Sequence, residues 1–257
     1  SSYNNIGGVG RQIFARIRLS EEANQKAIGN KTLIGRTLSV GYLEPYIFDI
    51  PIDWSISGSN SARANETWLL TQSAETAFSH KFRYVFPGSV LSLFYGQQIK
   101  REESSGEQKL GYLQVMGGNV RTGRIGARYR YDHRNNISWP TGGFLLNMEA
   151  SSARHEFGGD LAYDYWSIAN SYYLGLVEKL VLAVGFSFSS YYDISRKGTK
   201  ADILPVSETI YVGGADTVRG FAERDLGPKI EFDEFNDDEE RSRTEELIGG
   251  SNASVFK

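Results

Sequence analysis

The sequence of 257 residues has a formal net charge of -3, no cysteine, 28 glycines, 15 tyrosines and 14 phenylalanines. The charge gives no sign of a nucleic-acid partner, and the lack of cysteine excludes disulfides and thiolate metal sites. Glycine and aromatic residues favour turns and strands over helices. No run of about 18 apolar residues is present, which excludes a conventional transmembrane helix but not a membrane β-barrel, whose strands are short and alternating.

Nine segments alternate between apolar residues and small or polar ones, a period of two that predicts β-strands with different environments on their two faces. The predicted strands are 11–19, 34–42, 52–57, 67–78, 91–99, 124–132, 144–150, 161–171 and 180–191. Connections near 44–49, 80–87, 135–143 and 177–179 are short, whereas those near 20–31, 58–66, 100–110, 151–160 and 193–251 are longer or more polar. Short turns opposite long loops are typical of an outer-membrane barrel. The strands of a soluble β-sandwich, whose sheets have one solvent-exposed face, would also alternate between apolar and polar residues.

Aromatic residues near the predicted strand ends are interpreted as the girdle of a membrane barrel. They are Tyr42, Trp54, Trp68, Tyr95, Trp139, Tyr163 and Tyr191. The sequence therefore predicts an all-β fold, an antiparallel transmembrane β-barrel.

Charged residues on one face of the segment 124–132 cannot lie in an apolar core without partners. They can line a water-filled lumen, and other predicted strands carry charges of the same kind. The candidate lumen-facing charges are Arg16, Arg18, Arg124, Arg128, Arg130, Asp132 and Glu149.

The region 193–251 is far longer than a hairpin requires. Its second half, 231–246, is strongly acidic, and we predict that it is a solvated, mobile surface tip. Its carboxylates show no spaced ligand pattern, so no metal site is predicted there. The first half is rich in glycine, which suggests a functional loop that folds inward.

Three parts of that loop follow one another at a characteristic spacing: the pair Gly213-Gly214, the run Val218-Arg219-Gly220-Phe221, and the pair Gly227-Pro228. This composite resembles the signature loop of the BamA/TamA superfamily, the outer-membrane barrels that insert or translocate other proteins. Further matches lie at 5–10, 44–46, 131–136, 140–143 and 249–252. The resemblance thus extends over nearly the whole chain.

The resemblance implies a sixteen-stranded barrel in the bacterial outer membrane, of which residues 1–257 would supply one partial barrel domain with about nine strands. The long loop would fold into the lumen, with Arg219 pairing with a carboxylate on the barrel wall. Gly220 would allow the tight tip, and Val218 and Phe221 would pack it. A planar guanidinium suits such an anchor because it offers five donors in a fixed fork.

The function implied is non-catalytic assembly of other outer-membrane proteins at a lateral seam between strands. Membrane lipid, unfolded outer-membrane proteins and periplasmic lipoproteins are the expected partners, and no cofactor is expected. Translocation of one secreted partner is the alternative within the family. The family's periplasmic repeats are not seen in the sequence, and residues 1–5 are no signal peptide. We therefore expect an internal segment of a longer protein, with the carboxylate for Arg219 outside it.

An outer-membrane hydrolase is the alternative from another class. His80, His133 and His155 are the only histidines, and His133 follows Asp132. Adjacent residues of a strand point to opposite faces, which argues against a paired base. No nucleophile elbow, metalloprotease helix or phosphate-binding loop is present, so no catalytic residue is predicted.

Overall fold

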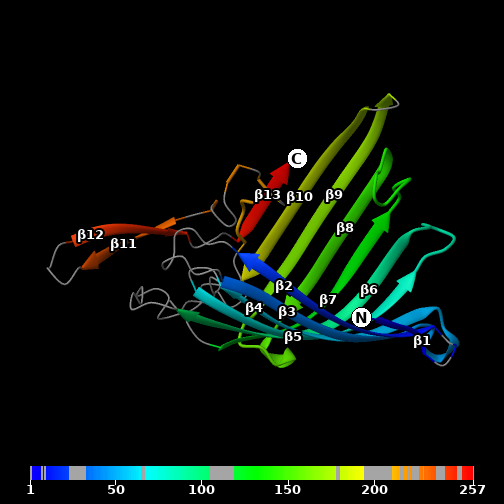
Figure 1. Ribbon diagram of the computed structural model, residues 1–257, viewed down its shortest axis with the longest axis horizontal. Helices are drawn as coiled ribbons and strands as arrows, with labels where there is room; N and C mark the ends of the chain where they lie inside the picture. Colours follow the sequence, from blue (N-terminus) through cyan, green and yellow to red (C-terminus); the bar gives the residue numbers. More distant parts are fainter. Residues whose placement is uncertain are drawn as a thin grey trace.

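The computed structural model describes residues 2–6, 8, 10–22, 33–64, 67–104, 119–177, 180–193, 210–214, 217–218, 220–221, 226–227, 229–235, 241–247 and 251–256. Eleven strands form one antiparallel sheet in the order β1-β2-β3-β4-β5-β6-β7-β8-β9-β10-β13, which curls into a trough (Figure 1). The strands are β1 Ser2–Ile6, β2 Arg11–Glu22, β3 Leu33–Glu44, β4 Ile52–Ala64, β5 Thr67–Lys81, β6 Ser89–Ser104, β7 Asn119–Asp132, β8 Gly142–Ala153, β9 Tyr163–Val177, β10 Leu180–Asp193 and β13 Asn252–Phe256.

The predicted antiparallel all-β fold is confirmed, and each of the nine predicted strands is present as one of β2 to β10. The structure adds β1 at one edge of the sheet, and at the other edge it confirms a strand, β13, that opens from the matching segment 249–252 after the loop. It also adds a separate hairpin of β11 (Lys229–Phe235) and β12 (Arg241–Leu247), which projects away from the sheet. Of the acidic stretch 231–246 predicted as a solvated tip, residues 231–235 and 241–246 thus have paired backbone, and residues 236–240 lie outside the described residues.

The two ends of the sheet carry different connections. Residues 45–51, 82–88 and 133–141 join strands at one end, called here the turn end, and residues 23–32, 65–66, 105–118 and 154–162 join them at the other, the loop end. The prediction of a long polar loop at 58–66 is wrong, because β4 continues to Ala64. Polar side chains do not interrupt the strand, because the backbone forms the hydrogen bonds between neighbouring strands. The hydroxyl groups of Ser59 on β4 and Ser73 on β5 also lie within hydrogen-bonding distance, 2.8 Å apart.

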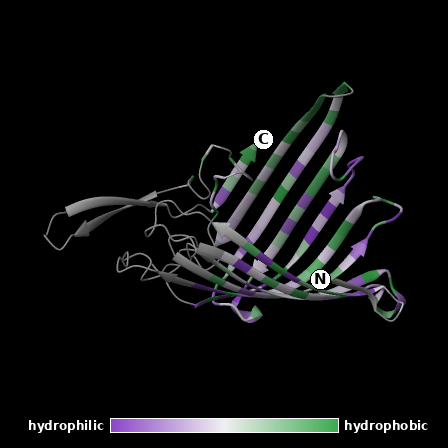
Figure 2. Ribbon diagram, viewed as in Figure 1, coloured by the Kyte–Doolittle hydropathy of each residue, from purple (hydrophilic) through white to green (hydrophobic). Residues whose placement is uncertain are grey.

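The strand register separates an apolar convex face from a polar concave face. Figure 2 shows the resulting alternation of hydropathy along the strands. Large apolar side chains lie exposed on the convex face of successive strands, among them Ile17, Leu38, Ile56, Phe78, Leu93, Ile125, Met148, Trp166 and Val184. On the concave face one row of directly paired residues is Arg16, Ser39, Ser59, Ser73, Gln98 and Thr122. Such a division is expected where one face meets lipid and the other water.

Some aromatic residues do not form the predicted girdle. Tyr163 and Tyr191 lie on the concave face, where their ring centroids are 5.2 Å apart and Tyr163 is only 2% exposed. The girdle interpretation is wrong for these two tyrosines, because a position near a strand end does not decide whether the side chain lies on the convex or the concave face. Tyr42 and Trp54 do lie on the convex face near the turn end and make an edge-to-face contact at 6.1 Å. The side chain of Trp68 lies outside the described residues.

Residues 154–160 fold over the loop end of β7, where β8 no longer pairs with it. The last β7–β8 pair is Arg124 with Ala153. Beyond it, the Arg154 amide donates to the Gly123 carbonyl at 3.3 Å, and the Asp160 amide donates to the Arg121 carbonyl at 2.7 Å. The segment therefore replaces β8 as the hydrogen-bonding neighbour of the upper part of β7.

Two short 3-10 helices lie in the connections, η1 (Ile47–Asp49) and η2 (His155–Phe157). Neither of these, nor any other helix in the described part of the chain, has the length and apolar character needed to cross a membrane.

Candidate functional site

Arg128 is the centre of an ion cluster on the concave face. Its Nη1 and Nη2 donate to the two carboxylate oxygens of Glu75 at 2.5 and 2.9 Å, and its Nε donates to Glu149 Oε2 at 3.0 Å. The guanidinium lies 3.7 Å from the centroid of the Phe94 ring. The arginine thus makes a bidentate contact, a second ion pair and a cation-π contact at once.

The strand register explains how residues of three other strands reach Arg128 on β7. Glu149 is directly opposite Arg128 on β8, whereas Glu75 must reach across β6 from β5. Phe94 of β6 lies over Gly126 of β7, where a Cβ would come within 2.8 Å of the ring. Because Gly126 has no side chain, the ring can lie along the wall and form the floor beneath the guanidinium.

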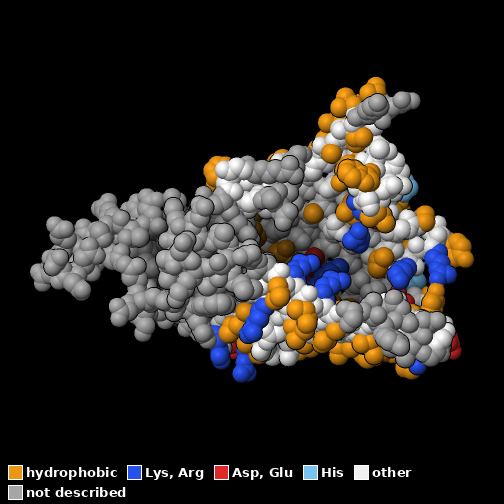
Figure 3. Space-filling model, in the orientation of Figure 1, with side chains coloured by type: hydrophobic (Ala, Val, Ile, Leu, Met, Phe, Trp, Pro, Cys, Tyr) orange, Lys and Arg blue, Asp and Glu red, His pale blue; other side chains and the backbone are white. Residues whose placement is uncertain are grey.

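The other predicted charges of this region differ in their pairing. Arg124 Nη1 lies 3.7 Å from Glu149 Oε1, and its guanidinium is 5.6 Å from the Phe94 centroid. Arg16 and Arg18 lie on the same concave face and are exposed, and within the described ranges neither side chain has an ion-pair or hydrogen-bond partner. Figure 3 shows Lys and Arg side chains gathered in the hollow of the trough.

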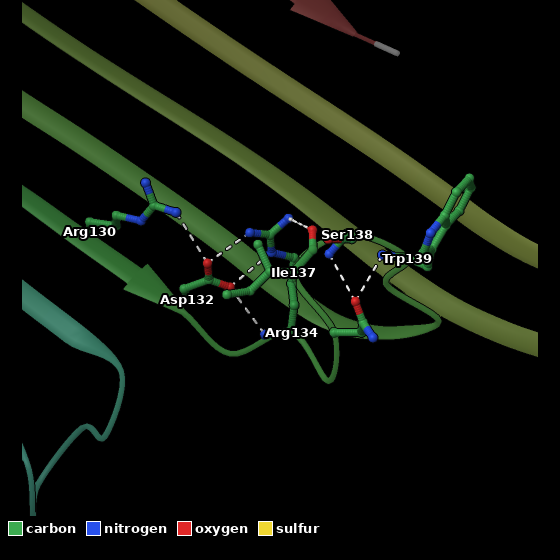
Figure 4. Close-up of polar contacts among 7 residues, drawn as sticks. Arg130, Asp132, Arg134, Ile137, Ser138 and Trp139 are labelled. Carbon is green, nitrogen blue, oxygen red and sulfur yellow. Dashed lines mark hydrogen bonds and ion pairs between the residues drawn. The ribbon is translucent and has the colours of Figure 1, made fainter. Parts of the chain in front are cut away.

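Asp132 and Arg134 hold the connection between β7 and β8 in one conformation (Figure 4). Arg134 Nε and Nη2 each donate to Asp132 at 2.8 Å, and Arg130 Nη2 donates to the same carboxylate at 3.2 Å. The carboxylate raises the pKa of the Arg134 guanidinium through these hydrogen bonds. Arg134 Nη1 also donates to the Ile137 carbonyl at 3.3 Å, so the fork ties the turn back to the end of β7.

Asparagine side chains complete this turn. Asn136 Oδ1 accepts hydrogen bonds from the amides of Ser138 and Trp139 at 2.9 and 3.0 Å. Asn135 Oδ1 accepts from the amides of Thr141 and Gly142 at 3.0 and 3.2 Å. The Asn136 bonds are of the Asx type, whereas the Asn135 bonds join the two ends of the connection.

The geometry does not support a His-carboxylate pair of a hydrolase. The ring of His133 contacts Tyr131 and Phe144, both with centroids 5.8 Å away, while Asp132 is bound by arginines. His80 and His155 hydrogen-bond to backbone carbonyls through Nδ1. In the part of the chain that the structure describes, no histidine hydrogen-bonds to a carboxylate.

The glycine-rich motif closes on itself as a small hairpin. Val212 and Leu226 exchange backbone hydrogen bonds at 3.2 and 2.9 Å, and the Gly214 amide donates to the Phe221 carbonyl at 3.1 Å. Gly220 adopts a φ of 101°, a left-handed conformation that favours glycine. Phe221 is 49% exposed. Of the predicted motif, Arg219 and Pro228 lie outside the described residues.

Thr217 closes the tip of this hairpin, a role that its position in the motif did not suggest. Its hydroxyl donates to the Gly213 carbonyl at 2.6 Å and accepts from the Gly213 amide at 2.8 Å. The Thr217 amide donates to the Gly214 carbonyl at 3.2 Å. The backbone of both glycines is thereby fixed at positive φ, 124° and 94°.

The sequence model of the Omp85 superfamily domain matches residues 5–256. The chain belongs to this superfamily. It is an outer-membrane β-barrel of the Omp85 type, and the predicted resemblance is confirmed at that level. Comparison with curated protein sequences gives no match.

Two solved structures with Omp85-like folds are similar to the chain. A crystal structure of BamA from Haemophilus ducreyi lacking POTRA domains 1–3 matches with a TM-score of 0.74 at 16% identity, covering 98% of this chain and 47% of that one. CdiB from Escherichia coli matches with a TM-score of 0.52 at 17% identity, covering 87% of this chain and 40% of that one. The chain therefore spans less than half the length of either structure.

Sequence reasoning missed two members of the Arg128 cluster in this Omp85 chain. Glu75 and Phe94 lie 53 and 34 residues before Arg128. Glu75 has the parity of Ser73 and Ser79, so the register of β5 with β6 would have placed it on the concave face. That register follows from the turn geometry and is not readable from alternation alone.

Proposed function

We propose that this Omp85 chain is part of a non-catalytic barrel that inserts other outer-membrane proteins into the membrane. A lateral seam between the first and last strands of the complete barrel would offer unpaired backbone groups to an incoming strand. Edge pairing of this kind gives affinity through main-chain hydrogen bonds, and most proteins prevent it. The partners would be membrane lipid, unfolded outer-membrane proteins and periplasmic lipoproteins.

One observation carries the proposal: the superfamily match over 5–256 coincides with a loop motif that is closed as a hairpin by Thr217. The fold also agrees more closely with the BamA structure than with CdiB, at TM-scores of 0.74 and 0.52. A closed tip at the end of a long loop suits a segment that docks against a wall, because less entropy is lost when a rigid tip is bound.

In this proposal Arg219 anchors the loop within the lumen. Its guanidinium would pair with a carboxylate of the barrel wall, while Gly220 supplies the left-handed turn beside it and Val218 and Phe221 pack around it. The pair Gly213-Gly214 and the pair Gly227-Pro228 would frame the tip. The loop would then support the wall from within while the seam opens.

The test uses the complete gene in cells depleted of the chromosomal copy. We expect Arg219→Ala to reduce the amount of heat-modifiable, folded outer-membrane proteins and the stability of the barrel itself. Arg243→Ala, which removes the same charge from the hairpin of the same loop, is the matched control and should behave like the natural protein. An Arg219→Ala protein with unchanged assembly and unchanged gel mobility contradicts the anchoring role.

Export of a single partner is the second candidate function, favoured by the similarity to CdiB. It predicts a different phenotype on depletion of the complete protein: one secreted polypeptide is lost from the medium, and the folded porins stay at their normal level. Quantifying both fractions in the same depletion culture separates the two functions.

A further inference from the structure

Arg16 and Arg18 are the members of the concave-face charge set that the structure leaves without a carboxylate. They project from β2 on either side of Ile17, which is 73% exposed on the convex face. Both arginine side chains are exposed, and no acidic group among the described residues contacts either. Two positive charges thus stand about 7 Å apart along the strand, two residues at the rise of an extended chain.

Their surroundings are small and polar. Ser39 is directly opposite Arg16 on β3 and Thr37 is opposite Arg18. The next strand continues the two rows with Ser59 and Ser61. Hydroxyl groups can donate to an anion, and small side chains leave the guanidinium groups room to reach one.

The contrast with Arg128 shows what a structural arginine looks like in this wall. The guanidinium of Arg128 contacts two carboxylates at its edge and an aromatic ring at one face. Its donors are directed into the wall and hold four strands together. Arg16 and Arg18 hold nothing together in the described structure, so their charge is available to solutes.

We propose that Arg16 and Arg18, with the hydroxyl rows beside them, form an anion-binding strip on the lumen wall that concentrates small anions such as chloride or sulfonates. Unpaired cationic side chains beside confined water raise the local potential, and low-dielectric walls focus it. Charged side chains on the lumen face are the positions that set ion selectivity in barrels and pores. The proposal requires the Omp85 barrel but not the assembly role.

The natural lack of cysteine makes a direct measurement of this potential simple. The full-length protein in vesicles receives a single thiol by Ser39→Cys, opposite Arg16. The modification rate is measured with an anionic methanethiosulfonate, which carries a sulfonate, and with a cationic one, which carries a trimethylammonium group. The ratio of the two rates reports the potential at the strip and needs no through-channel current.

We expect the anionic reagent to be favoured, and the double change Arg16→Gln and Arg18→Gln to lower the rate ratio by about fourfold in 0.1 M salt, roughly twofold in that ratio for each charge near the probe. The effect should shrink at 1 M salt, where the screening length falls to about 3 Å. In planar bilayers the same variant should shift the reversal potential in a potassium chloride gradient toward cation selectivity.

Arg36→Gln is the matched control, because Arg36 lies on β3 opposite Leu19, on the convex face. It removes the same charge from the other side of the wall and should leave the rate ratio unchanged. An unaltered ratio in the Arg16/Arg18 variant, or an equal change in Arg36→Gln, overturns the proposal. Assembly activity is measured in parallel, so a failure of the strip and a failure of the insertion function are distinguishable.

Discussion

Replacing Arg128 by methionine tests the structural cluster of the lumen wall most directly. Methionine keeps much of the side-chain length and can still pack against Phe94, so the change mainly removes the charge and its hydrogen bonds. Glu75 and Glu149 would then face each other without the cation between them. We expect a clear loss of barrel stability.

The geometry sets the size of that loss. Arg128 donates three charge-assisted hydrogen bonds of 2.5, 2.9 and 3.0 Å, and such bonds each contribute about 1.5–3 kcal/mol when shielded. Its side chain is 33% exposed, however, and those of the glutamates 27% and 22%, so water screens the cluster in part. Exposed ion pairs contribute below about 1 kcal/mol. Between these limits we expect Arg128→Met to destabilise the barrel by about 2–4 kcal/mol.

The assay is denaturant unfolding of the full-length protein in lipid vesicles, followed by tryptophan fluorescence and by heat-modifiable gel mobility. Adding Glu75→Gln and Glu149→Gln to the methionine variant should recover about half of the loss, because no uncompensated charge remains. Arg16→Met is the control, with the same substitution on the same face at an unpaired arginine. If Arg128→Met costs no more unfolding free energy than Arg16→Met, the cluster does not stabilise the wall.

Three further predictions concern local contacts. Asp132→Asn loosens the fork on Arg134, so trypsin should cleave the turn after Arg134 several-fold faster, with a stability loss of about 1–2 kcal/mol. Thr217→Val removes both hydroxyl bonds of the loop tip and should expose the loop to proteolysis, whereas Thr217→Ser should protect it; equal cleavage of the two variants contradicts the closure. Gly41→Ala should cost about 1–3 kcal/mol in unfolding free energy because its Cβ would collide with the Phe14 ring, and adding Phe14→Leu should recover most of that loss.

Alternation was sufficient to predict β2 to β10 because each strand separates lipid from water over most of its length. It failed where the apolar residues give way to small and polar ones: the residues 58–64 look like a loop but continue β4. Face assignment failed for Tyr163 because tyrosines occur on both faces of β9, such as Tyr163 and Tyr172. Alternation alone does not decide which set of alternate residues in such a strand lies on the concave face.

The candidate site was predictable only in part for a similar reason. Arg128 and Glu149 were identifiable from parity, but their meeting with Glu75 and Phe94 depends on the register of three strand pairs. Register is set by turns and by the sum of side-chain contacts. The loop motif was recognisable from its spacing, whereas the bonds of Thr217 could be seen only once the tip was folded.

If the complete barrel recruits strands as proposed, the covering of β7 by residues 154–160 bears on where it can do so. β7 continues past the last residue of β8 that pairs with it, and such a step would leave an open row of backbone donors and acceptors at the loop end of the sheet. The amides of Arg154 and Asp160 occupy carbonyls of that row, and the Asp160 carboxylate accepts from the Arg121 amide at 2.9 Å. A barrel that recruits strands at one site must be inert to them at its other exposed edges. By occupying backbone groups of β7, this small segment would keep the barrel inert there.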